Sequence, residues 1–281
     1  MIKIEGFSWR YIGSKNKAIE DVSLEIEDGE FLCIIGPNDS GKTTLAMSMN
    51  GLIPNNYNGI MEGNVIVEGL NTREHSTSEI SKYVGYLFSD PESQFLSMTV
   101  EEELAFGLEN QGLPTSEIEE RIRWAMELTG IPESYLEKPP YELSGGEKQR
   151  VAIASVLAIK PKIIVLDEPT SMLDPLGKSE VINTLKELKK SYNATIVVVE
   201  HRLEDLAGMA DRFILVHNGK VVKDAKSQDF FEDIDFLLAH EVFPPGYMVL
   251  INALRREGYY NGGIPLTLNQ ALKIMESVLG V

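Results

Sequence analysis

Nine residues near the N-terminus constrain this chain more than any other feature of its sequence. They read Gly36-Pro37-Asn38-Asp39-Ser40-Gly41-Lys42-Thr43-Thr44. An apolar run at 31–35 precedes them and apolar residues at helical spacing follow, so the stretch joins a strand to a helix. Its two glycines let the backbone wrap around phosphate oxygens, with N–H groups and a helix N-terminus facing the anion. The pattern predicts a phosphate-binding loop.

Two acidic residues after a later apolar run fit the same chemistry. Asp167 and Glu168 directly follow an apolar stretch of the kind expected in a buried strand. Asp167 can hold Mg²⁺ beside the Thr43 hydroxyl, and Glu168 can polarise a water molecule for attack on a γ-phosphate. Lys42 is placed to reach the outer phosphates. Together these residues predict a site for ATP and Mg²⁺ rather than an ordinary pair of solvated acids.

Composition limits the partners of the chain. Its 281 residues carry a net charge of −17, and contact with a nucleic-acid backbone needs clustered Lys and Arg, so we expect no nucleic-acid partner. No apolar run reaches the ~20 residues needed to cross a bilayer, and the N-terminus lacks the pattern of a signal peptide. The single cysteine, Cys33, excludes an intrachain disulfide and is typical of a reducing compartment.

The strand patterns indicate an α/β fold with two kinds of sheet. Alternating apolar residues at 2–7 and 22–26 predict antiparallel strands with one wet face, joined by a loop at 9–14 with exposed aromatic rings. Runs at 163–166 and 195–199 are apolar throughout, which predicts parallel strands buried on both faces. The stretch before a short strand at 65–67 contains glycines and is expected to be irregular.

A helical region interrupts these strands. Thr99 with Glu102 forms a capping box at the start of one helix, and Ser116 with Glu119 forms a second. Each pair lets a hydroxyl and a carboxylate bond the free backbone N–H groups of a first helical turn. We therefore expect two helices that begin at these positions.

A second candidate anion site lies at the start of a later helix. Ser144 and Glu147 form a further capping box ahead of that helix. Gly145 and Gly146 carry no side chain that could cover the first backbone N–H groups, and a helix N-terminus favours negative charge. The stretch therefore predicts a structural cap and a phosphate-binding surface at once.

The order of these motifs resembles that of the nucleotide-binding subunits of ATP-binding cassette (ABC) transporters. Residues 36–44 resemble the Walker A loop, residues 163–168 the Walker B strand, and residues 143–147 the signature sequence, which few other P-loop proteins carry. Four more features complete the resemblance: Gln94 at the Q-loop, His201 at the switch histidine, Ser171-Met172-Leu173-Asp174 as the D-loop, and Tyr11 as the aromatic residue that stacks on adenine.

The resemblance covers about residues 1–230 and implies how the chain is divided. It implies a P-loop NTPase (ABC ATPase) core with a mainly parallel sheet, an N-terminal antiparallel β subdomain and a helical signature subdomain at about 92–160. Residues 231–281 would form a small α-rich C-terminal domain that contacts a second subunit.

The family's roles carry over residue by residue. Gln94 would sense Mg²⁺ and the attacking water, and His201 would donate a hydrogen bond to the γ-phosphate. Tyr11 would stack on adenine, with the ring of Trp9 as a rival. Asp39 stands where the family most often has glycine; aspartate tolerates a left-handed backbone, but a carboxylate near phosphates is repulsive unless it points outward.

The resemblance also implies that one chain does not complete a site. Ser144, Gly145 and Gly146 would close over a nucleotide held by a second ABC ATPase subunit, with Asp174 nearby. Two chains packed head to tail would then enclose two ATP molecules. The intact motifs fit either a homodimer or a heterodimer.

One branch of the family is more similar than the others. Residues 90–95 and 99–107, with a tail containing Pro265-Leu266-Thr267, resemble the ATPase subunits of energy-coupling factor (ECF) transporters, which include cobalt and nickel types. These importers take up vitamins or transition-metal ions through a transmembrane energy-coupling subunit and a substrate-capturing membrane subunit, with the ATPases at the cytoplasmic face of the membrane. Substrate choice lies in another polypeptide, so this sequence does not reveal it.

Other interpretations stay open at this point. The chain could serve another class of ABC importer, a soluble ABC ATPase that works on DNA or ribosomes, or a non-catalytic ATP binder. The net charge and the short distance between Lys42 and Ser144 disfavour the second interpretation, and Glu168 and His201 disfavour the third. The apolar residues after Gln94, which are Phe95, Leu96 and Met98, fit either a buried core or a patch that docks a membrane subunit.

Overall fold

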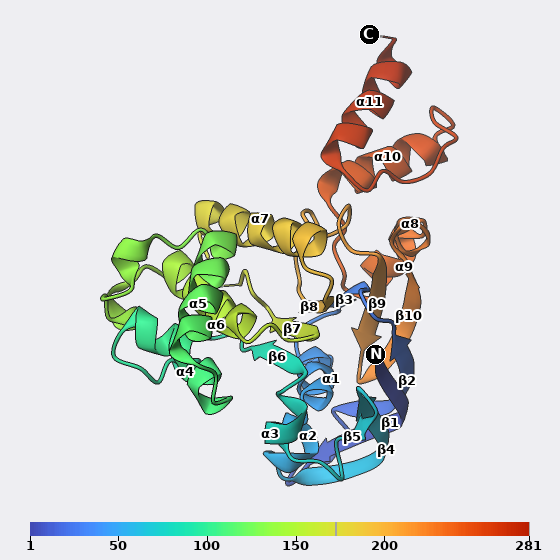
Figure 1. The fold of residues 1–281 in the computed structure, drawn as a ribbon. Coiled ribbons are helices and arrows are strands. Elements are labelled where there is room, and N and C mark those ends of the chain that lie inside the picture. Colours follow the sequence, from blue (N-terminus) through green and yellow to red (C-terminus); the bar gives the residue numbers. More distant parts are fainter. Residues whose placement is uncertain (172, 281) are drawn as a thin grey trace.

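The computed structural model describes residues 1–171 and 173–280. They form two β-sheets, a group of helices beside the larger sheet, and a helical C-terminal segment that projects away from the rest (Figure 1). The larger sheet has the strand order β10-β9-β3-β8-β7-β6. From edge to edge these are β10 (Lys220–Lys226), β9 (Arg212–His217), β3 (Phe31–Ile35), β8 (Thr195–Val199), β7 (Ile163–Asp167) and β6 (Val84–Leu87).

The central strands of this sheet are parallel and buried, as their unbroken apolar runs predict. β3 pairs in parallel with β8 and β9, and β7 pairs in parallel with β8 and β6. Every residue of β3, β7 and β8 is buried. Because parallel strands end at the same edge of a sheet, the segments that follow β3, β6, β7 and β8 meet there. That edge carries most of the predicted site residues.

The smaller sheet is antiparallel, with the order β2-β1-β4-β5. Its strands are β2 (Ile19–Ile26), β1 (Ile2–Tyr11), β4 (Gly59–Val67) and β5 (Leu70–Asn71). The predicted alternation is confirmed, since Ile2, Ile4 and Phe7 are buried on one face of β1. These side chains share a core with α1 (Lys42–Met49), the helix that follows the phosphate-binding loop.

Two expectations for this sheet are wrong. The loop predicted at 9–14 is in part strand: β1 continues to Tyr11, and the Trp9 side chain is only 1% exposed. β4 begins at Gly59 rather than at residue 65, because the glycines there permit close packing. A Cβ on Gly59 would come within 2.2 Å of the Trp9 ring, and one on Gly63, whose φ is 72°, within 2.3 Å of the Glu5 carbonyl.

The predicted helical region lies beside the far edge of the larger sheet (Figure 1). Its α-helices are α4 (Val100–Asn110), α5 (Thr115–Thr129) and α6 (Gly145–Ala158), with short 3₁₀ segments η1 (Pro91–Gln94), η2 (Glu133–Tyr135) and η3 (Pro140–Glu142). The capping boxes at Thr99 and Ser144 are confirmed. The one at Ser116 is wrong, because α5 already begins at Thr115, after Pro114, and no side chain caps it.

The remaining helices connect or extend the core. They are α2 (Leu52–Asn55), α3 (Thr77–Ile80), α7 (Pro175–Ser191), α8 (Ser227–Phe231), α9 (Ile234–Ala239), α10 (Gly246–Arg256) and α11 (Leu268–Leu279). Figure 1 shows α8 and α9 beside β9 and β10, while α10 and α11 project beyond them. In the described part of the chain, every helix is too short or too polar to span a bilayer. The division near residue 230 stays a prediction.

Candidate functional site

The predicted phosphate-binding loop forms a cavity of about 450 Å³, here called the phosphate-loop pocket. It is lined by Tyr11, Ala18, Asn38, Asp39, Ser40, Gly41, Lys42, Thr43, Thr44 and Glu168. The loop is packed so tightly that side chains are excluded at both glycines: a Cβ on Gly36 would lie 2.0 Å from the Val216 carbonyl oxygen, and one on Gly41 2.4 Å from the Ala18 carbonyl oxygen. The pocket is therefore walled largely by backbone.

Three observations show that this pocket fits the phosphates of a nucleotide. Ser40 Oγ is buried and has no hydrogen-bond partner among the described residues. Lys42 is buried, and its ammonium donates to the Pro37 carbonyl oxygen at 2.8 Å. Burial lowers the pKa of Lys42, although the nearby carboxylates of Glu168, Asp167 and Asp39 oppose this. A buried cation and an unpartnered hydroxyl are groups that an anion would satisfy.

Asp39, the one departure from the family's pattern, adopts the backbone conformation expected of it. Its φ is 59°, in the left-handed region, and its side chain is exposed. The loop therefore accommodates aspartate at this position, as predicted.

Asp167 lies between two hydroxyl groups. Thr43 Oγ1 donates to Asp167 Oδ1 at 3.3 Å, and Tyr86 Oη donates to Asp167 Oδ2 at 3.2 Å. Burial raises the pKa of Asp167, and these hydrogen bonds oppose the shift. A threonine hydroxyl beside a carboxylate is an oxygen pair that suits Mg²⁺. No three His, Cys, Asp or Glu side chains of the described chain gather into a ready-made metal cluster, so phosphate and water oxygens would complete the coordination.

Glu168 and His201 are in direct contact, although 33 residues separate them in sequence. His201 Nε2 lies 2.8 Å from Glu168 Oε1. That hydrogen bond holds the pKa of Glu168 below its usual range, so the carboxylate is ionised near neutral pH and the histidine nitrogen must be the donor. Glu200 orients the histidine, because its carboxylate accepts from the backbone N–H of His201 and from Thr170.

Of the two aromatic residues proposed to stack on adenine, Trp9 is excluded and Tyr11 remains. Trp9 is buried beneath β4 and cannot stack on a ligand. Tyr11 is partly exposed, lines the phosphate-loop pocket, and its hydroxyl lies 3.1 Å from Thr44 Oγ1. Adenine stacking by Tyr11 stays a prediction.

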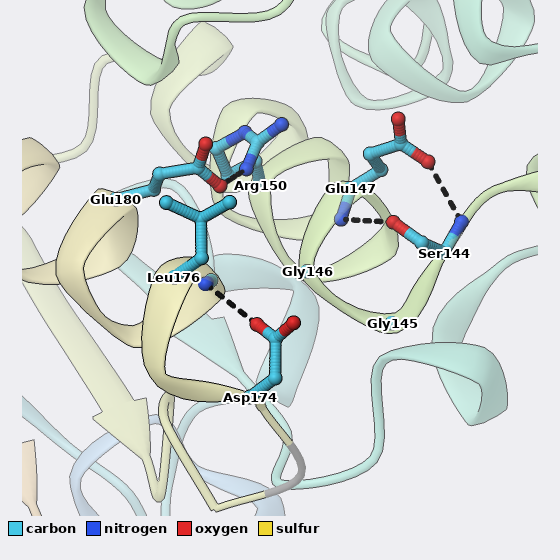
Figure 2. A pocket seen from close by; sticks show the side chains of 9 residues that line it. Ser144, Gly145, Gly146, Glu147, Arg150, Asp174, Leu176 and Glu180 are labelled. Atoms are coloured by element: carbon cyan, nitrogen blue, oxygen red, sulfur yellow. Dashed lines mark hydrogen bonds and ion pairs between the residues drawn. The ribbon is translucent and has the colours of Figure 1, made fainter.

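A second cavity, of about 350 Å³, surrounds the start of α6 and is here called the signature pocket (Figure 2). Ser144 Oγ accepts from the Glu147 backbone N–H, and Glu147 accepts from the Ser144 backbone N–H. Asp174 lies on the opposite wall, where it caps α7 by accepting from the Gly177 backbone N–H at 2.8 Å. Met172, part of the predicted D-loop, lies outside the described residues.

The signature pocket shares no lining residue with the phosphate-loop pocket. It therefore offers anion-binding donors at a place where Lys42, Thr43 and Asp167 do not contribute. The two predicted phosphate-binding surfaces are separate within one chain.

Gln94 also stands apart from the phosphate-loop pocket. Its side-chain oxygen accepts from the Phe88 backbone N–H at 3.3 Å, so the amide faces the end of β6. Two residues before it, Glu92 forms an ion pair of 2.5 Å with Lys148 of α6. This contact ties the segment that carries Gln94 to the helix that begins at the signature pocket.

Comparison with known proteins identifies the family. The sequence profile described as "ABC transporter" matches residues 19–171, more than half of the chain. The chain belongs to the ABC transporter family. The energy-coupling factor transporter ATP-binding protein EcfA2 of Clostridium tetani is 40% identical over 278 residues, which covers 97% of this chain and 95% of that protein.

Two solved structures are similar to this ABC ATPase. One is cbiO1 from Clostridium perfringens, part of the ABC transporter complex cbiONQ, with a TM-score of 0.74, 30% identity, and coverage of 89% of this chain and 98% of that one. The other is a dimeric ATP-binding cassette in a post-hydrolysis state with ADP and Pi, with a TM-score of 0.70, 29% identity, and coverage of 81% and 99%. The predicted fold class is confirmed, and this ABC protein is an ATPase that uses ATP and Mg²⁺.

Sequence reasoning missed two contacts in this ABC ATPase. The Tyr86 hydroxyl reaches Asp167, a contact that the sequence analysis does not predict. The Tyr135 hydroxyl and the Ser144 backbone N–H together hold the pKa of Glu147 at about 2. Neither contact has a local sequence signal, because each joins segments that are distant along the chain or separated by an irregular loop.

Proposed function

We propose that this chain is the ATP-hydrolysing subunit of an ECF-type ABC importer, which powers the uptake of a vitamin or transition-metal ion through membrane partners. The observation that carries the proposal is the likeness to EcfA2 across nearly the whole chain, including the C-terminal tail beyond residue 171, where the family profile ends. The likeness to cbiO1 supports it from structure. The subunit would then lie at the cytoplasmic face of the membrane as a peripheral component.

Within this proposal, the residues of the phosphate-loop pocket divide the chemistry. The backbone N–H groups of residues 38–44 and the Lys42 ammonium hold the phosphates, and Tyr11 stacks on adenine. Thr43 and Asp167 would hold Mg²⁺, which neutralises charge on the β- and γ-phosphates when it is bound, and Gln94 would join them by leaving its contact with the Phe88 backbone N–H. Glu168 orients and polarises the attacking water, and His201, whose N–H donates to Glu168 in this structure, would turn that N–H to the γ-phosphate.

The separation of the two pockets supports a working unit of two subunits. The signature pocket has N–H donors from Gly145 and Gly146 at a helix N-terminus but none of the groups that hold Mg²⁺. A head-to-tail dimer would place these donors, with Ser144 and Asp174, over the nucleotide in the phosphate-loop pocket of its neighbour. The exposed apolar residues Leu268, Leu272 and Leu279 of α11 support a further dimer contact in the C-terminal segment.

Glu168→Gln tests this dimer. Removing the base but keeping its size should leave ATP binding intact, stop hydrolysis and trap a closed dimer in Mg-ATP, which size-exclusion chromatography with light scattering would detect. The control is Lys42→Ala with Glu168→Gln, which should stay open because the phosphates are not held. A Glu168→Gln protein that remains monomeric in saturating Mg-ATP, with its usual partner subunit present, would contradict the proposal.

A groove between the core and the helical region supports docking of a membrane partner. It has a volume of about 1050 Å³ and is lined by residues of α3, β6, α4 and α6, including Tyr86, Phe88 and Phe106. The Phe106 side chain is 44% exposed, and at the adjoining loop Leu96 and Met98 are 73% and 74% exposed. Glu102 and Glu103 of α4 hold that loop by accepting from its backbone N–H groups, so its apolar side chains face outward.

Of the two interpretations left open for this loop, a buried core is wrong for Leu96 and Met98, while Phe95 is partly buried against the core. We assign the groove to a segment of the transmembrane energy-coupling subunit. Phe106→Glu should abolish co-purification with that subunit from membranes. Phe243→Glu is the matched control, because Phe243 is 75% exposed but lies before α10. Equal retention of both variants would contradict this assignment, and co-sedimentation with ribosomes instead would favour a soluble role.

A further inference from the structure

The carboxylate of Asp167 is held from two sides by different elements. Thr43, at the start of α1, occupies Oδ1, and Tyr86, on β6, occupies Oδ2. Thr43 is a predicted Mg²⁺ ligand, so its hydroxyl would turn toward an ion when one is bound. The Tyr86 hydroxyl has no such competing role, and it is the contact that would remain.

Strand register explains why Tyr86 reaches this carboxylate. β6 and β7 are parallel neighbours, and Tyr86 is paired with Val165. Residues two apart on a strand point to the same face, so Val165 and Asp167 share the face on which Tyr86 lies. The Tyr86 ring packs against the core on that face, and its hydroxyl extends one step along the sheet to Asp167. The sheet itself therefore sets the position of the donor.

β6 and the residue after it also face the groove. Tyr86 and Phe88 both line it, and their rings pack edge to face with centroids 4.8 Å apart. The Phe88 backbone N–H holds the side chain of Gln94. Two neighbouring groove residues thus contact the two side chains, Asp167 and Gln94, that the proposed function assigns to the metal.

We propose that Tyr86 is a positioning residue that fixes the Asp167 carboxylate for Mg²⁺ and links it to the groove. This inference rests on the proposed function in one respect, the assignment of Asp167 to the metal. Hydrogen bonds from such outer groups orient a metal-binding carboxylate, and their loss typically weakens metal binding. A tyrosine that is also a wall of the groove makes the metal site sensitive to what occupies the groove.

Tyr86→Phe tests the inference, because it removes the hydroxyl and keeps the ring. ATP-dependent binding of Mn²⁺, used in place of Mg²⁺, is measured by electron paramagnetic resonance in the Glu168→Gln background, where hydrolysis is blocked. We expect the dissociation constant of Mn²⁺ to rise on the order of 10-fold, while ATP affinity in EDTA changes by less than about twofold, since Asp167 does not hold the phosphates directly.

Tyr83→Phe is the matched control. Tyr83 precedes β6 by one residue and is partly buried, and among the described residues its hydroxyl makes no hydrogen bond. Its Mn²⁺ titration should match that of the parent. Melting temperatures of both variants check that any change in metal binding is not a loss of folding.

Two outcomes separate this inference from the proposed function. If Tyr86→Phe binds Mn²⁺ as the parent does while Asp167→Asn does not bind it, the positioning role is wrong and the metal site stands. If Asp167→Asn also binds Mn²⁺ as the parent does, the assignment of Asp167 to the metal is wrong, and the positioning role falls with it.

Discussion

The phosphate-loop pocket and the signature pocket are both predicted to hold phosphate, but they are built differently. In the first, close approach of distant segments sets the shape: Gly36 lies against β9, and Gly41 against the residue before β2. In the second, a local capping box and the N-terminus of α6 present the donors. One pocket depends on the whole core, and the other depends on one helix and the loop beside it.

The contents of the two pockets differ in a complementary way. The phosphate-loop pocket has the buried lysine and the nearby pair of Asp167 and Glu168, whereas the signature pocket has free helix N–H groups and the cap residue Ser144. Each lacks what the other supplies. The comparison supports the proposal that the chain carries two halves of a site, and the following experiments would break or sharpen that proposal.

The largest effect is expected from disabling each half separately. Lys42→Ala and Ser144→Arg should each lower ATP turnover by on the order of 10²–10³-fold, because each removes stabilisation of charge on the γ-phosphate. Mixing equal amounts of the two proteins should restore about a quarter of wild-type turnover, since half of the dimers that form at random contain one of each variant, and each of these has one intact site out of two.

Mixing Lys42→Ala with Glu168→Gln is the control for that experiment. Both substitutions lie in the phosphate-loop pocket, so the mixed dimer has no intact site and should stay inactive. If ATP turnover recovers in the control mixture, or does not recover in the mixture of Lys42→Ala and Ser144→Arg, the two pockets do not form a shared site between subunits.

A smaller effect is expected from adding one methyl group to each pocket. Gly41→Ala should lower the free energy of unfolding by about 1–3 kcal/mol, because φ is 108° and the Cβ would crowd the Ala18 carbonyl oxygen. Gly146→Ala should change it by less than about 1 kcal/mol, because the residue is helical and its nearest contact is 3.3 Å away. Urea unfolding measures both, and equal losses would mean that the two pockets are built alike.

The smallest effect concerns acid sensitivity of the signature pocket. The pKa of Glu147 is held at about 2, below the 4.5 of the unfolded chain, by donors from Tyr135 and Ser144. Its contribution to stability is therefore present above pH 4.5 and is lost as the pH falls toward 2. Tyr135→Phe should flatten the change in unfolding free energy between pH 5 and 3, compared with the wild type, in urea titrations at several pH values.

Glu142→Gln serves as the comparison for that measurement. Glu142 is exposed and lies two residues before Ser144, outside the capping box. If Tyr135→Phe and Glu142→Gln change the pH dependence of the unfolding free energy equally, the capping box of Ser144 and Glu147 is not the source of the acid sensitivity.

Much of the fold and of the candidate site could be predicted where the physics is local. The parallel strands were predicted because burial on both faces leaves an unbroken apolar run, and β3, β7 and β8 are indeed fully buried. The boxes at Thr99 and Ser144 were predicted because a cap is a contact between residues three apart.

The expectations that the structure contradicts, and the contact that the sequence did not predict, share one cause. Gly59 and Gly63 suggested an irregular segment. In the structure they lie in β4 and leave room for the residues of β1 that pack against them. Ser116 has the spacing of a box, yet the helix already begins at Thr115, with Pro114 as an extended N-cap residue. Tyr86 was overlooked because its partner, Asp167, is 81 residues away. Contacts between distant segments leave no trace in a short window of sequence.

The ion pair between Glu92 and Lys148 has a consequence for turnover. It joins the 3₁₀ turn that carries Gln94 to the helix whose first residues would face a nucleotide on the opposite subunit. In a head-to-tail dimer, the turn that carries Gln94 would respond to the ATP of its own subunit, and the start of α6 would contact the ATP of the neighbouring subunit. A displacement at one ATP would then be relayed to the other inside a single polypeptide, and the dependence of rate on ATP concentration is expected to be sigmoidal.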